Sequence, residues 1–147
     1  MPIYVLHSDD AVADGAKPVR EAMFVLQGYI KDQKILEAMD LSLTEAYGNA
    51  ARHAYPQGTG PVDVVLEVDP GREVILEVAD WGKGLTGIDC VNPDSCTLPG
   101  PGSEGGRGFY LINQSCDRVT MHTDKGRHAV RMALAVPKRS WRAKTTA

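Results

Sequence analysis

The sequence predicts an α/β domain of the α+β kind, a two-layer sandwich with helices on one face of a mixed, mostly antiparallel sheet. Two pairs of β-rich segments, each joined by a short turn sequence, predict hairpins. Two stretches with apolar residues every three or four positions predict amphipathic helices. At 147 residues, 43% of them hydrophobic and 24% charged, the chain is long enough to bury the core of one globular domain.

The elements follow one another without an internal repeat. Pro56 and Gly58 are expected to end the second helix, and the turn sequences DPGR and DKGR close the two hairpins. In chain order we expect a strand at 3–6, helices at 19–33 and through 43–56, strands at 62–68 and 73–79, a short helix at 109–116, and strands at 117–123 and 128–136.

Composition narrows the class of protein. A net charge of −3 gives no general reason to expect nucleic-acid binding, and no apolar run approaches the roughly 20 residues of a membrane span. The start, MPIYVLHSDD, does not resemble a secretory signal. The three cysteines, Cys90, Cys96 and Cys116, cannot all pair within one chain and favour reduced thiols. We therefore expect a cytoplasmic protein without membrane or direct nucleic-acid contacts.

The last residues differ in charge from the rest. Segment 137–147, PKRSWRAKTTA, contains four Lys and Arg residues and no acid. A short basic end of this kind is usually solvated. We expect a single domain at 1–136, followed by a flexible basic tail at 137–147.

The second helix has two chemically different faces. At about 100° per residue, Glu45, Asn49 and Arg52 are expected on the face opposite the apolar stripe. A carboxylate and an amide one turn apart offer the oxygen ligands that Mg²⁺ accepts, although for this pair on its own a solvated polar face is the favoured interpretation. The apolar stripe comprises Leu36, Met39, Leu43, Tyr47, Ala50 and Ala54.

An acidic residue followed by glycines ends the strand at 73–79. Asp80, Gly82 and Gly84 come directly after it. Glycines let the backbone pass close to a ligand, and a carboxylate can accept a hydrogen bond from the exocyclic amine of adenine. A simple turn after an edge strand is the alternative.

A second glycine cluster precedes the short helix. The segment 99–109, PGPGSEGGRGF, leads into it through Gly105, Gly106, Arg107 and Gly108. Free N–H groups at a helix N-terminus bind phosphate, and an arginine adds a charge-assisted donor. Taken alone, the cluster could also be a flexible linker.

The order of these three motifs resembles the ATP-binding boxes of the GHKL (Bergerat-fold) family. LSLTEAYGNAARHAY at 41–55 resembles its N box, VADWGKG at 78–84 its first glycine box and GGRGFYLI at 105–112 its second. The resemblance spans roughly residues 16–136. The amino-acid sequences of these boxes are most similar to those of the small bacterial anti-sigma-factor serine kinases.

The resemblance implies roles for the residues of the helix. Asn49 matches the asparagine that completes the coordination of Mg²⁺, and Glu45 matches the general base one turn earlier. Arg52 occupies a place where a basic residue often reaches the nucleotide.

The glycine boxes carry the remaining implied contacts. Asp80 matches the aspartate that binds the adenine amine, with Gly82 and Gly84 beside the base. The segment Gly105, Gly106, Arg107 and Gly108 matches the Gly-rich ATP lid that closes on the phosphates.

The resemblance implies an ATP- and Mg²⁺-dependent serine-protein kinase. Its expected substrate is a serine of an anti-sigma antagonist of the STAS fold, its other partner a sigma factor, and its state a homodimer. Two alternatives stay open: a non-catalytic ATP-binding regulator that sequesters a partner protein, and a hydrolase or detached histidine-kinase-type ATPase domain.

Overall fold

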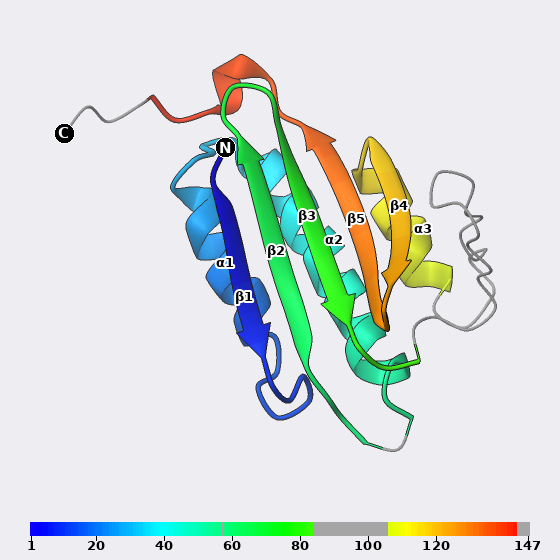
Figure 1. Ribbon diagram of the computed structural model, residues 1–147. Coiled ribbons are helices and arrows are strands. Elements are labelled where there is room, and N and C mark those ends of the chain that lie inside the picture. Colours follow the sequence, from blue (N-terminus) through cyan, green and yellow to red (C-terminus); the bar gives the residue numbers. More distant parts are fainter. Residues whose placement is uncertain (57, 84–105, 144–147) are drawn as a thin grey trace.

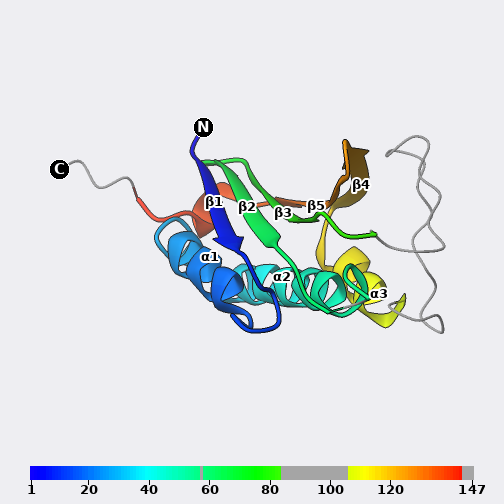
Figure 2. The ribbon, with the colours of Figure 1, turned by 60° about the horizontal axis from the view of Figure 1, so that its bottom comes forward.

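In the part of the chain that the structure describes, the fold has two layers, a five-stranded sheet and three α-helices that all lie on one of its faces (Figures 1 and 2). The computed structural model describes residues 1–56, 58–83 and 106–143. Within them, the strand order is β1-β2-β3-β5-β4 and every neighbouring pair is antiparallel. The predicted α+β sandwich is confirmed.

The elements agree in kind and order with those expected. Their bounds are β1 Ile3–Ser8, α1 Lys17–Gln27, α2 Gln33–His53, β2 Val62–Asp69, β3 Glu73–Asp80, α3 Gly106–Ser115, β4 Arg118–Asp124, β5 Arg127–Ala135 and a 3-10 turn at Lys138–Ser140.

Both hairpins form at the predicted turn sequences. Gly71, between β2 and β3, has a φ of +85°. Lys125 and Gly126, between β4 and β5, have φ values of 51° and 82°, as a two-residue hairpin turn of the favoured twist requires.

The core lies between the helices and the sheet face that they cover. All six residues of the predicted α2 stripe are at most 8% exposed, so α2 packs on the sheet as the helical spacing indicated. Alternate strand residues such as Leu66, Leu76 and Met132 are fully buried. None of the helices within the described ranges is long and apolar enough to cross a membrane.

The first helix ends earlier than expected. We predicted a helix over 19–33, but α1 ends at Gln27. Asp32 instead begins the next helix, because its side chain accepts a hydrogen bond from the Lys34 N–H at 3.0 Å. Ile30 is fully buried within this connection and forms a β-bridge with Trp141.

The expectation of a flexible tail over 137–147 is wrong for its first part. Trp141 is only 9% exposed, and its indole Nε1 donates to the Val136 carbonyl at 3.0 Å. Lys31 N–H donates to the Ser140 carbonyl at 2.9 Å, and Arg142 N–H to the Tyr29 carbonyl at 2.8 Å. The charge pattern was misleading because the tail also contains a large apolar ring. The domain extends to Arg142, and 144–147 lie outside the described residues.

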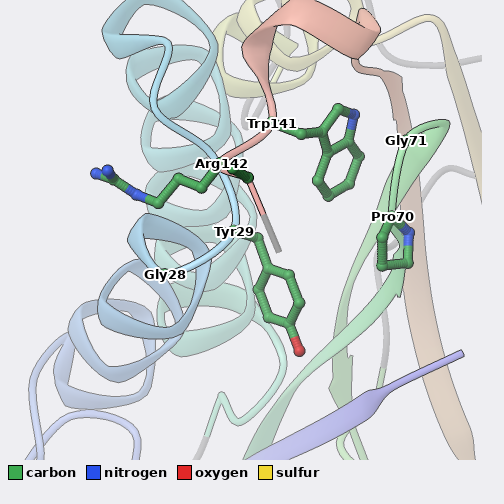
Figure 3. A pocket seen from close by; sticks show the side chains of 7 residues that line it. Gly28, Tyr29, Pro70, Gly71, Trp141 and Arg142 are labelled. Atoms are coloured by element: carbon green, nitrogen blue, oxygen red, sulfur yellow. The ribbon is translucent and has the colours of Figure 1, made fainter. Parts of the chain in front are cut away.

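A pocket of about 400 Å³ lies where this C-terminal segment meets the β2–β3 turn (Figure 3). The Trp141 ring faces Pro70 across it, while the Arg142 side chain points away. Because β3 runs from this turn to Asp80, the pocket and Asp80 lie at opposite ends of the sheet.

Candidate functional site

The C-terminal end of α2 meets the end of β3, and this junction brings several predicted site residues together (Figure 1). The Lys83 N–H donates to the Ala54 carbonyl at 2.8 Å. The N box and the first glycine box are therefore in direct backbone contact.

Asp80 is a buried carboxylate on the helix-facing side of the sheet. It is 8% exposed and continues the alternation of the buried Val74, Leu76 and Val78. Its Oδ1 accepts a hydrogen bond from the Gly82 N–H at 3.0 Å. Burial raises the pKa of Asp80, while the Gly82 N–H and the nearby His128 oppose that rise. A carboxylate held this way keeps acceptor capacity for a ligand N–H.

Gly82 permits the close approach of β3 to α2. A Cβ added at this position would lie 2.0 Å from the Ala54 carbonyl oxygen. No side chain fits there, so this glycine is required by packing against the helix end.

The helical spacing had indicated that Asn49 lies on an outward polar face, but the structure places it in the interior. It is 2% exposed. Ser42, Ala46 and Asn49 form a second buried line beside the apolar stripe. The Ser42 hydroxyl contacts the Cys116 thiol at 3.3 Å, directly after α3. Helix α3 packs against α2, so the side of α2 that bears these three residues is part of the interior.

The Asn49 amide is only half satisfied. Its Oδ1 accepts a hydrogen bond from Arg52 at 3.0 Å, while its buried Nδ2 has no hydrogen-bond partner among the described residues. A buried amide N–H without a partner costs roughly 1–3 kcal/mol. Such an orphaned donor is expected where a ligand completes the hydrogen bonding.

Arg52 is exposed and its guanidinium folds back along the helix. A Cβ at Gly48 would lie 3.0 Å from its Nη1, so this glycine leaves room for the guanidinium beside Asn49. A cation bound to the Asn49 oxygen would require Arg52 to turn to another acceptor, and a phosphate oxygen is a suitable one.

Glu45 lies one helical turn before Asn49, about 6 Å along the axis. It is partly exposed, which keeps its carboxylate accessible from solvent. The helix thus presents a carboxylate and an amide on the same flank.

The second glycine box forms the start of a helix. Gly106, Arg107 and Gly108 are the first three residues of α3, whose first N–H groups have no partner within the helix. α3 packs against α2 and begins on the side of the molecule where α2 ends (Figure 1). Gly84, Gly105 and most of the predicted lid lie outside the described residues.

The sequence interpretation missed two residues of this junction. His128 lies opposite Asp80 in the β3–β5 register and shares a hydrogen bond with Thr123 at 3.1 Å. Tyr55 follows the helix and bonds to the backbone of Trp81. Neither the pairing of His128 with Asp80 nor the hydrogen bond of Tyr55 to Trp81 had a local signal, because each connects segments that are distant in the chain.

Comparison with known proteins identifies the class of this α+β domain. Residues 13–134 match the model of the histidine kinase-like ATPase domain family. The chain belongs to this family, and the predicted resemblance to GHKL-type domains is confirmed.

The sequence identity between this chain and individual relatives is low. The chain is 31% identical over 99 residues to the serine-protein kinase RsbW of Bacillus mycoides, and equally to that of Bacillus cereus, covering 62% of this chain and 59% of each relative. It is 26% identical over 92 residues to the anti-sigma F factor of Clostridium acetobutylicum, covering 63% of this chain and 64% of that protein. The chain thus spans about three fifths of the length of these curated relatives.

Proposed function

We propose that the protein is an ATP-dependent serine-protein kinase that phosphorylates an anti-sigma antagonist of the STAS fold and also binds a sigma factor. The family and the names of the relatives support this class. In this proposal it works in the cytoplasm as a homodimer. The observation that carries the proposal is the half-satisfied amide of Asn49, buried on α2 near its junction with the strand end that bears Asp80.

The strand end and the helix would bind the nucleotide. Asp80 accepts a hydrogen bond from the adenine amine. Gly82 holds the strand end against Ala54 beside the base, and Gly84 lets the base approach the backbone. Arg52 turns from Asn49 to the phosphates. The lid residues Gly105 to Gly108 offer free N–H groups to the phosphates at the start of α3.

The amide oxygen of Asn49 is a suitable ligand for Mg²⁺, the ion that the family uses. Mg²⁺ commonly keeps water and substrate phosphates as ligands, so the single amide oxygen of Asn49 suffices on the protein side. When bound, the ion neutralises negative charge on the phosphate oxygens.

Glu45 would act as the general base. It accepts the proton of the incoming serine hydroxyl as that oxygen forms its bond to the terminal phosphorus. The bond between that phosphorus and the bridging oxygen breaks, and ADP leaves. The partly exposed position of Glu45 suits a substrate that arrives from another protein.

The test is phosphate transfer from labelled ATP to a candidate antagonist. Glu45→Ala is expected to abolish transfer while keeping most of the nucleotide affinity, and Asp80→Asn to weaken binding itself. Glu37→Ala changes an exposed acid of the same helix and serves as the matched control. Unchanged transfer by Glu45→Ala would exclude the base role.

The chemical nature of the product separates the alternatives. Acid-stable phosphoserine supports the proposal. Acid-labile phosphohistidine or free phosphate would indicate a histidine-kinase-type domain or a hydrolase. Nucleotide binding without transfer would indicate a non-catalytic regulator.

A further inference from the structure

One side chain joins three backbone segments at the candidate site. The Tyr55 hydroxyl donates to the Pro61 carbonyl and accepts a hydrogen bond from the Trp81 N–H at 3.0 Å. Pro61 directly precedes β2, and Trp81 directly follows Asp80. The hydroxyl therefore links the end of α2, the start of β2 and the end of β3.

The ring of Tyr55 is held in place. A Cβ at Gly60 would lie 2.5 Å from its Cε1, so the ring packs on a glycine that has no room for a side chain. A phenol has one proton to donate, and the Pro61 carbonyl accepts the hydrogen bond from it. Burial raises the pKa of Tyr55, so this proton stays in place at neutral pH.

The segment that Tyr55 holds bears the proposed adenine contact. Asp80 is adjacent to Trp81, and its carboxylate already accepts the Gly82 N–H. The Arg127 guanidinium lies over the Trp81 ring, 5.9 Å from the ring centroid. Arg127 in turn contacts Glu77 at 2.7 Å. The strand end is therefore fixed from the helix side by Tyr55 and from β5 by Arg127.

We propose that Tyr55 is a positioning residue for nucleotide binding, which sets the place of the Asp80 carboxylate relative to Asn49 through its hydroxyl. The inference rests on the proposed nucleotide site. Tyr55 lies six residues after Asn49, just beyond the end of α2 at His53. Its hydroxyl therefore connects the helix that bears the proposed metal ligand to the strand end that bears the proposed adenine contact. Without it, the Trp81 N–H would bond to water, and the strand end would be held to the end of α2 by the Lys83–Ala54 hydrogen bond and the packing of Gly82 on Ala54.

The test compares two tyrosine variants of the full chain. Tyr55→Phe removes only the bridging hydroxyl. Tyr47→Phe is the matched control, because the Tyr47 hydroxyl is buried on α2 and donates instead to the Ala11 carbonyl, at 3.4 Å. Dissociation constants for Mg·ADP are measured by calorimetry, and amide hydrogen exchange at Trp81 reports whether the strand end has loosened.

The expected result is specific to one variant. Tyr55→Phe should weaken Mg·ADP binding about tenfold, equivalent to one net hydrogen bond, and speed exchange at Trp81. Tyr47→Phe should change neither. Equal affinity of Tyr55→Phe and the wild type, or equal losses in both variants, would overturn the positioning role. Absence of Mg·ADP binding by the wild type would instead refute the nucleotide site, and the positioning role with it.

Discussion

Replacing Gly82 with alanine should separate the two halves of the candidate site. The added Cβ would lie 2.0 Å from the Ala54 carbonyl oxygen, 2.6 Å from its carbon and 3.0 Å from its Cβ. Cβ contacts below 3.0 Å essentially do not occur, so the backbones must part by at least about 1 Å (3.0 − 2.0). The Lys83 N–H to Ala54 hydrogen bond of 2.8 Å would lengthen beyond a useful range.

The expected losses of stability and of nucleotide affinity follow from this displacement. Overpacking of this kind costs about 1–3 kcal/mol of stability. Asp80 is two residues away and would move with the backbone. Loss of the proposed charge-assisted hydrogen bond between Asp80 and the adenine amine is worth about 1.5–3 kcal/mol, so Mg·ADP should bind roughly 10- to 100-fold more weakly.

Calorimetric titration with Mg·ADP and urea unfolding together form the assay. Gly71→Ala is the control, because Gly71 has a φ of +85° and nothing within 4 Å of an added Cβ. It should cost about 1–2 kcal/mol through the backbone alone, at the other end of the sheet, and leave nucleotide affinity unchanged. If both alanine variants bind Mg·ADP equally, the contact between Gly82 and Ala54 does not position the site.

Two further changes test the burial of single groups. Asp80→Asn removes a buried charge: burial raises the folded-state pKa above the ordinary 3.8, so the wild type loses stability as pH rises through that interval. The stability of the variant relative to the wild type should therefore increase between pH 3.8 and pH 7, as urea midpoints will show, and a constant difference would contradict this. Trp141→Ala should cost about 3–5 kcal/mol, or roughly 10–15 °C in Tm, whereas Phe24→Ala at a 79% exposed site should cost under about 0.5 kcal/mol. Similar thermal shifts for the two would mean that the C-terminal segment does not pack.

Local patterns were sufficient for most of the fold. The α2 stripe and the two hairpins depend on spacing and turn residues within short segments, and the structure confirms them. The turn at Lys125 and Gly126 required only a two-residue sequence of the favoured kind.

The errors at Asn49, Trp141 and Tyr55 share a physical cause, which is contact between distant segments. Asn49 was expected on an outward face because the helix was considered alone, whereas α3 packs beside it. Trp141 was included in a flexible tail because its neighbours are basic, whereas Ile30, over one hundred residues earlier, pairs with it. Tyr55 was interpreted only as part of a helix end.

The two tryptophans of the protein lie near opposite ends of the sheet, so the fluorescence of each reports on a different region. Trp81 is 41% exposed beside Asp80, and Trp141 is 9% exposed beside the pocket at the β2–β3 turn. Dissolved quenchers such as acrylamide should reach the first indole far more readily than the second. Emission from a Trp141→Phe variant therefore reports on the Asp80 end alone, and emission from Trp81→Phe follows the C-terminal segment without interference.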